Sequence, residues 1–76
     1  MIRPKQVKRP TAVEAVLHRL ERLVEEGRWP EGRLPPEREL AAELETSRAT
    51  LREALRLLRS LGVVEAAPRR GTRLVN

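Results

Sequence analysis

The feature that most constrains the fold of this chain is a very short junction between two helical patterns. The first pattern covers residues 36–45, and the second begins at Ser47 and stops at Gly62. Serine is a favoured N-cap residue and glycine a favoured helix stop. Two helices joined by so few residues must turn sharply, which is the geometry of a helix-turn-helix. In the helix predicted over residues 36–45, the inward-facing residues are expected to be Leu40, Ala41 and Leu44.

An amphipathic helix precedes this unit. It is predicted to start at Thr11, because Glu14 three residues later completes a capping box, and to end at Gly27. The connector that follows, "RWPEGRLPP", contains three prolines and a glycine. In it we expect Leu34 to form a very short strand and Trp29 to close the end of an aliphatic core. The apolar residues at helical spacing are Val13, Val16, Leu17, Leu20, Leu23 and Val24.

After the second helix of the helix-turn-helix, which stops at Gly62, the pattern changes to two β-prone runs. The runs are "VVEAA" and "TRLV", and the "PRRG" between them suits a hairpin. The order of helix, helix, helix and hairpin predicts a mainly α fold with a small β-hairpin, which is a winged helix-turn-helix with three helices plus a wing. We expect residues 11–76 to form this domain and residues 1–10 to be a flexible basic arm.

Charge is distributed unevenly along the chain. Residues 1–10 hold four basic groups and no acid, residues 11–46 hold five arginines against nine glutamates, and residues 47–76 hold seven arginines against two glutamates. A basic lobe on a small domain favours a polyanionic partner, most often nucleic acid. The alternative, from charge alone, is an arginine-rich composition without a partner.

The composition also excludes several classes of protein. The chain has no cysteine, so disulfides and thiolate metal sites are excluded. It has no apolar run long enough to cross a bilayer and no hydrophobic segment typical of a secretion signal, so we expect a cytoplasmic protein. His18 with Glu21 and Glu25 could imitate a metal cluster, but a solvated helix flank is the preferred interpretation. No nucleophile–base pair is evident, so we predict neither an enzyme nor a metal or cofactor.

The helix that begins at Ser47 has two different faces. At about 100° per residue, its arginines fall within an arc of about 80°, away from the apolar stripe. An α-helix fits the major groove of duplex DNA, where arginine binds guanine O6 and N7 and also neutralises phosphates. The arginines are Arg48, Arg52, Arg56 and Arg59, and the stripe consists of Leu51, Ala54, Leu55, Leu58 and Leu61.

The position of each residue along this helix indicates whether it is a candidate for contacting bases or only adds positive charge near the DNA backbone. Helix-turn-helix proteins reach bases from the N-terminal part of the recognition helix. The residues of that part are Arg48, Ala49, Thr50 and Arg52. We expect Arg56 and Arg59 to meet the DNA backbone or solvent, and a solvated charged face is the alternative for the whole row. Ser47 is expected to cap the helix, and its hydroxyl could also meet a phosphate.

Three arginines outside this helix are also candidates. The hairpin tip "PRRGT" places Arg69 and Arg70 on a protruding turn beside Gly71. Narrow minor grooves attract inserted arginine, although a polar tip without this function is the alternative. Arg38 lies between two glutamates, and from these residues alone a local ion pair is the preferred interpretation.

A long stretch of the chain resembles a known family. The run "ERELA…SRATLREAL", followed by "LGVV" and "RRGT", spans two helices and the wing in the correct order. Residues 34–75 thereby resemble the N-terminal DNA-binding domain of GntR-family bacterial transcription regulators, and "SRATLREAL" is most similar to the FadR-type branch. The resemblance implies a repressor that binds palindromic operators as a dimer. Family members carry a larger C-terminal effector domain, which we expect beyond Asn76, so we predict a homodimer for the full-length protein and a monomer for this chain off DNA.

The resemblance also implies roles for matching positions. Arg38 of "ERELA" matches an arginine that contacts DNA, which replaces the local ion pair as the preferred interpretation. Arg48 is expected at a guanine, and Thr50 and Arg52 match positions that contact bases or phosphates. The wing glycine matches Gly71, beside which an arginine enters or flanks the minor groove. The predicted DNA-binding residues are Arg38, Ser47, Arg48, Ala49, Thr50, Arg52, Arg69, Arg70, Gly71 and Thr72.

Two positions depart from the family pattern. Pro36 stands where a helix-capping serine is usual, and although proline suits a first helical turn, it cannot cap through its side chain. Glu45 stands where glycine is usual, and its backbone would be strained if φ were positive. A carboxylate at this position would also repel DNA, so a turn of a different shape from that of the family is the alternative.

Two functions of other classes remain as alternatives. In the first, the same winged helix is a protein-interaction module whose arginines meet an acidic partner. In the second, the basic face follows the phosphates of a structured RNA. Enrichment of a palindromic sequence from a random pool of duplexes would favour DNA over both alternatives.

Overall fold

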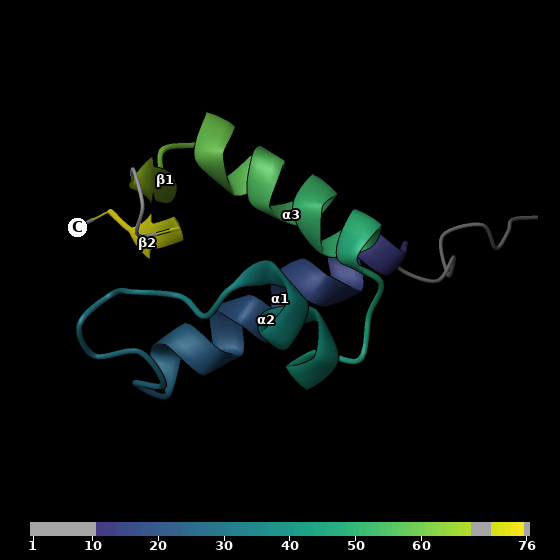
Figure 1. Ribbon diagram of the computed structural model, residues 1–76, viewed down its shortest axis with the longest axis horizontal. Coiled ribbons are helices and arrows are strands. Elements are labelled where there is room, and N and C mark those ends of the chain that lie inside the picture. The colour runs from purple at the N-terminus through teal and green to yellow at the C-terminus, as the bar shows by residue number, and fades with distance from the viewer. Residues whose placement is uncertain (1–10, 68–70, 76) are drawn as a thin grey trace, which may run out of the picture.

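Three helices followed by a two-stranded hairpin make up the part of the chain that the computed structural model describes, residues 11–67 and 71–75 (Figure 1). The elements are α1 (Ala12–Glu25), α2 (Glu37–Glu43), α3 (Arg48–Ser60), β1 (Val64–Ala67) and β2 (Gly71–Leu74). The strands are antiparallel, with Val64 opposite Leu74 and Ala67 opposite Gly71. The predicted winged helix-turn-helix is therefore confirmed.

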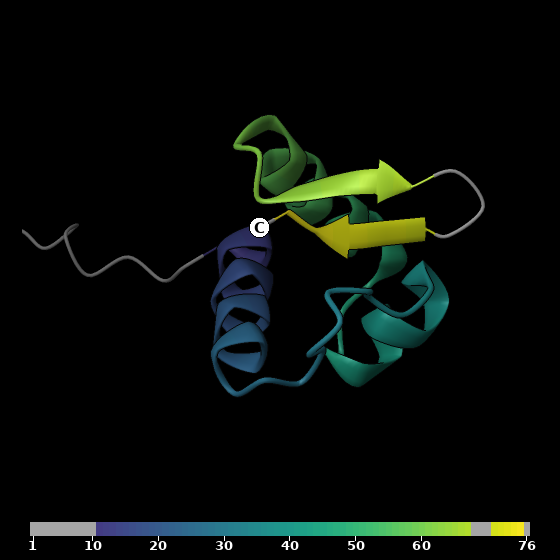
Figure 2. The ribbon, with the colours of Figure 1, turned by 90° about the vertical axis from the view of Figure 1, so that its left-hand side faces the viewer.

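The core lies where α3 meets the other elements. α3 contacts α1, α2 and β1, and Figure 2 shows the hairpin in front of α3 with α1 and α2 below it. Burying each large aliphatic side chain contributes about 1.5–3 kcal/mol, so this small set supplies most of the driving force. Trp29 is half-buried and packs against the core. The buried residues are Val16, Leu20, Leu34, Leu40, Ala41, Leu44, Leu51, Ala54, Leu55 and Val64.

The helix starts follow the sequence signals. At α1, the Thr11 hydroxyl accepts a hydrogen bond from the Glu14 N–H at 3.1 Å, and the Glu14 carboxylate accepts from the Thr11 N–H at 2.9 Å. This is the predicted capping box. α2 begins after Pro36, which makes no side-chain cap hydrogen bond, and it ends at Glu43, two residues earlier than predicted.

Each of the three helices ends in a Schellman motif, in which the residue after the C-cap has a positive φ. After α2, the Glu45 N–H donates to the Ala42 carbonyl at 3.1 Å and the Thr46 N–H donates to the Ala41 carbonyl at 3.0 Å. The positive-φ residues are Gly27 (78°), Glu45 (56°) and Gly62 (78°). Because the φ of Glu45 is positive, this residue carries the strain of the left-handed conformation, which costs a residue with a Cβ roughly 1–2 kcal/mol.

The connector between α1 and α2 joins the hairpin by a single bridge rather than a full strand. Arg33 bridges Arg73 in the antiparallel sense, and the N–H of the buried Leu34 donates to the Thr72 carbonyl at 2.9 Å. The expected very short strand is thus reduced to one residue pair. This bridge still ties the wing to the rest of the domain.

Two residues of the predicted apolar faces are exposed rather than buried, and Val24 of α1, which is 40% exposed, is the first of them. Leu61 is 73% exposed, whereas Leu51, Ala54 and Leu55 are buried and Leu58 is half-buried. Leu61 lies at the margin of the apolar stripe and is the C-cap residue, one position beyond the last residue of α3. Helical periodicity shows which side of a helix a residue faces, but it does not show whether the core extends that far.

Several expectations concern residues outside the described ranges, a membrane-spanning helix or a metal site. The basic arm, residues 1–10, lies outside the described residues, as do Arg69 and Arg70 of the wing tip. Within the described ranges, no helix is long and apolar enough to cross a membrane. In the same ranges, no group of three His, Cys, Asp or Glu side chains is placed to hold a metal, and His18 is exposed on α1.

Candidate nucleic-acid interface

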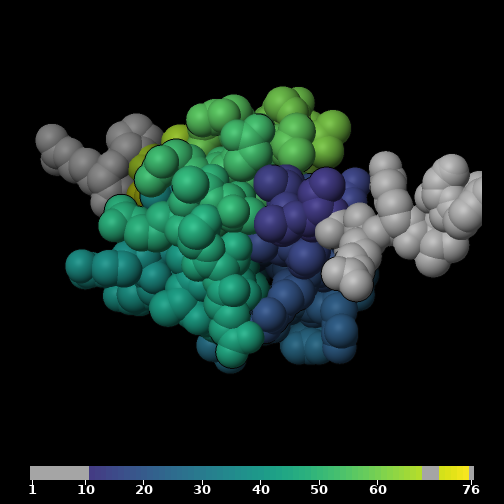
Figure 3. Space-filling model, turned by 90° about the vertical axis from the view of Figure 1, so that its right-hand side faces the viewer, coloured from purple at the N-terminus to yellow at the C-terminus, as the bar shows by residue number. Residues whose placement is uncertain are grey.

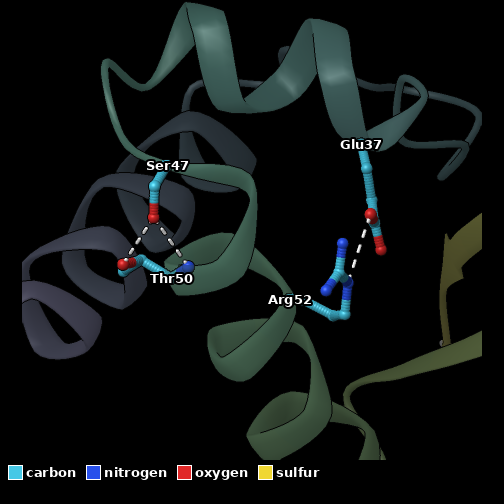
Figure 4. A network of polar contacts seen from close by, with 4 residues as sticks. All are labelled: Glu37, Ser47, Thr50 and Arg52. Atoms are coloured by element: carbon cyan, nitrogen blue, oxygen red, sulfur yellow. Dashed lines mark hydrogen bonds and ion pairs between the residues drawn. The ribbon is translucent and has the colours of Figure 1, made fainter.

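The start of α3 is organised by Ser47. Its hydroxyl accepts a hydrogen bond from the Thr50 N–H at 3.0 Å and donates one to the Thr50 hydroxyl at 2.9 Å (Figure 4). Ser47 is exposed, Thr50 is half-buried, and the first turn of α3 contains no acidic residue. Since the N-terminus of a helix carries partial positive charge, this turn is an electrostatically suitable place for a phosphate.

The arginines of α3 form an exposed row along the flank of the helix beside its core-facing side. Arg48, Arg52, Arg56 and Arg59 are all exposed, as is Ala49. Arg56 pairs with Glu53, one turn before it, at 2.8 Å, and Arg52 pairs with Glu37 of α2 at 3.5 Å. A DNA duplex placed here would therefore meet a row in which the charges of Arg52 and Arg56 are partly neutralised by glutamates. Arg48 has no ion-pair partner among the described residues.

Arg38 lies on α2, one residue after Glu37, which pairs with Arg52 of this row. Its side chain is exposed, and within the described part of the chain it pairs with neither neighbouring glutamate. Glu37 instead reaches α3. The local ion pair that the residues alone favoured is therefore wrong, and Arg38 remains open to a partner. Figure 3 shows the surfaces of α2 and α3 as one continuous face beside α1.

Of the DNA-binding residues predicted for the wing, the structure describes Gly71 and Thr72. Gly71 has φ 80° and is exposed, and a Cβ placed there would meet nothing within 4 Å. Glycine is thus needed for the backbone conformation rather than for space. Thr72 is half-buried, and its carbonyl is occupied by the Leu34 N–H. On β2, Arg73 pairs with Glu65 of β1 at 3.6 Å.

Two arginines outside the helix-turn-helix, Arg19 and Arg28, contact the end of α2, and no pattern in the sequence predicted this. Nη1 of Arg19 donates to the Leu44 carbonyl at 3.1 Å, and Arg28 pairs with Glu43. Both contacts join residues far apart in the chain, so no spacing rule could find them. They tie the C-terminal end of α2 to Arg19 of α1 and to Arg28, which follows α1, and so restrain the position of α2.

Together these features define a class of protein. A helix-turn-helix whose second helix presents arginines, followed by a β-hairpin tied to the domain, is a winged helix of the kind found in regulatory proteins. A family model described as bacterial regulatory proteins, gntR family, matches residues 12–74. The chain belongs to the gntR family.

Solved structures support this assignment. A GntR protein of Streptococcus agalactiae is 38% identical, with a TM-score of 0.72, and the match covers 84% of this chain and 31% of that chain. The N-terminal domain of AraR, crystallised with a mutant ORR3, is 24% identical, with a TM-score of 0.75, and the match covers 88% of this chain and 97% of that chain. The AraR DNA-binding domain in complex with operator ORR3 is 22% identical, with a TM-score of 0.75, and the match covers 99% of this chain and 93% of that chain. The likeness to AraR shows the shared fold.

Proposed function

We propose that this domain binds double-stranded DNA sequence-specifically, as part of a bacterial transcription regulator. In this proposal α3 lies in the major groove and the β1–β2 wing lies at the adjacent minor groove. The observation that carries it is the exposed arginine row of α3, which starts at the first turn and lies beside the core-facing side of the helix. Membership of the gntR family and the complexes of the similarly folded AraR with operator DNA support the same function.

The residues take different roles in this complex. Arg48 binds a guanine through its two ring-edge acceptors, and Arg52 reads a neighbouring base. Arg38 reads or clamps a base from α2, and Ser47 contacts the DNA backbone from the start of α3, which helps to fix the orientation of α3. Arg56 supplies charge that does not depend on sequence. The remaining proposed contacts come from Ala49, Thr50, Arg69, Arg70, Gly71 and Thr72.

The finer assignment concerns the branch and the mode of regulation. The run "SRATLREAL" supports a FadR-type regulator that represses transcription from a palindromic operator. A palindrome requires two copies of the domain related by a two-fold axis, so the regulator acts as a homodimer. Its target is the bacterial chromosome, so it works in the cytoplasm.

Selection from a random pool of duplexes tests the proposal. The chain is incubated with duplexes that carry a randomised central region, the bound fraction is amplified, and the cycle is repeated before sequencing. The proposal predicts enrichment of a sequence with two inverted half-sites. Binding without enrichment would leave only charge-driven association, and retention of structured RNA in preference to duplex DNA would favour the RNA alternative.

A further inference from the structure

Arg52 and Glu37 connect the two helices of the helix-turn-helix. Nε of Arg52, in the second turn of α3, lies 3.5 Å from Oε1 of Glu37, the first residue of α2 (Figure 4). The side chains are 51% and 37% exposed, respectively. Solvent screens a pair this open, so it contributes little to the stability of the fold. Its consequence is for the orientation of the arginine.

We propose that Glu37 is a positioning residue that sets which edge of the Arg52 guanidinium meets DNA. This inference rests on the proposed function, since it assumes that Arg52 reads a base. A guanidinium is planar and carries five N–H donors in a fixed fork. With the carboxylate on the Nε side, the two terminal nitrogens form the edge that is left for another acceptor pair. Guanine O6 and N7 are such a pair.

Glu37 also lowers the conformational freedom of Arg52 before DNA arrives. A long arginine side chain loses rotamer freedom when it binds, and a side chain that is already restrained loses less. Arg48 provides the contrast, because no ion pair among the described residues restrains it. The restraint strengthens the correct contact relative to incorrect ones, so Glu37 acts on discrimination.

The charge of Glu37 acts in the opposite direction on general affinity. A carboxylate beside the DNA-binding face repels phosphates of every sequence. Glu37 therefore weakens binding to random DNA while it sharpens the preference at the base pair under Arg52. A purely structural ion pair would show the same increase in random binding, but no change in discrimination confined to one base pair.

Glu39 offers a matched control. It lies in the same first turn of α2, is exposed, and makes no ion pair within the described residues. Glu39→Ala removes the same charge from the same helix end as Glu37→Ala, so both variants change the helix-dipole interaction and the net charge alike. Only Glu37→Ala frees Arg52.

The experiment measures dissociation constants for the selected duplex, for every single-base-pair variant of it, and for a random duplex. We expect Glu37→Ala to reduce discrimination about fivefold at one base pair, the same one at which Arg52→Ala abolishes discrimination. Both Glu37→Ala and Glu39→Ala should bind the random duplex about two- to threefold more tightly. Glu39→Ala should keep wild-type discrimination at every position. Glu37→Gln, which keeps an acceptor oxygen without the charge, should keep part of the discrimination.

Distinct outcomes overturn the inference and the proposed function. If Glu37→Ala and Glu39→Ala keep the same discrimination, or if Glu37→Ala loses affinity equally at all positions, Glu37 does not position Arg52. The inference also fails if Arg52→Ala in a Glu37→Ala background causes as much further loss as it does alone, because coupled residues are not additive. If the wild-type chain selects no sequence at all, the proposed function itself has failed. Thermal unfolding of each variant verifies that the fold is retained.

Discussion

Nη1 of Arg19 on α1 donates a hydrogen bond of 3.1 Å to the carbonyl of Leu44, the residue that closes α2. The Leu44 side chain is buried, and its carbonyl is one of those that a helix end leaves without an intrahelical partner. The next residue is Glu45, with its positive φ. One charged donor from α1 therefore fixes the helix-turn-helix at the point where the chain turns from α2 to α3.

Replacing Arg19 should destabilise the domain. Arg19→Met keeps the length of the side chain but removes the donor, and the loss of a hydrogen bond to a charged group should cost about 1–2 kcal/mol of unfolding free energy. In a domain of this size, that corresponds to a decrease in Tm of roughly 4–8 °C per kcal/mol. Arg22→Met is the control, since among the described residues the side chain of Arg22 makes no hydrogen bond or ion pair. Equal effects of the two substitutions would contradict the role of the bond.

Relieving the turn should stabilise the domain. Glu45→Gly removes the Cβ from a left-handed residue, and after the entropy that glycine adds to the unfolded chain, the net gain should be about 0.5–1 kcal/mol. Glu45→Ala removes the charge but keeps the Cβ, so it should give no such gain. Chemical denaturation of the three proteins separates the two effects. A gain in Glu45→Ala equal to that in Glu45→Gly would show that charge, rather than backbone strain, dominates at this position.

Ser47 allows capping and DNA binding to be separated. Ser47→Ala should lose about 1 kcal/mol of stability, because the first turn of α3 loses its side-chain acceptor. Ser60→Ala removes another exposed hydroxyl of α3 and should change stability by less than about 0.5 kcal/mol. Ser47→Asp retains a capping acceptor but adds a negative charge, so it should fold normally and bind duplex DNA about tenfold more weakly. Normal DNA binding by Ser47→Asp would remove the start of α3 from the interface.

Arg56 should contribute affinity without sequence preference. Arg56→Ala should weaken binding to all duplexes by the same factor and reduce the slope of log affinity against log salt by about 1. Arg22→Ala, on α1, changes the net charge equally and should leave the salt slope nearly unchanged. The readout is a salt titration of binding for both variants. A shift in base preference in Arg56→Ala would instead place this arginine at a base.

Local signals in the sequence predicted most of the fold. Ser47 and the Thr11–Glu14 pair marked helix starts, and Gly27 and Gly62 marked helix ends, because caps depend on residues within one turn. The glycine usual in the family marked Glu45 as a place where φ could be positive, but the sequence left open a turn of another shape. Leu61 was placed wrongly, since periodicity within one helix does not show how far its neighbours extend.

Contacts between distant segments were not predictable in the same way. The Arg19 bond to Leu44, the Arg33–Arg73 bridge and the Arg52–Glu37 pair depend on how whole elements pack, and nothing in their spacing indicates them. The exposed arginine row of α3 followed from periodicity. Its partial neutralisation by acids of α2 and α3 did not, and this neutralisation distinguishes the members of the row.

The central claim is that the first turns of α3 read DNA sequence, and Arg48→Ala tests it most directly. Dissociation constants are measured for wild-type protein and variant on the selected duplex and on a random duplex. The account predicts that the variant loses about 1–3 kcal/mol on the selected duplex, relaxes its preference at one base pair, and changes much less on random DNA. An equal loss on both duplexes would contradict base reading by Arg48.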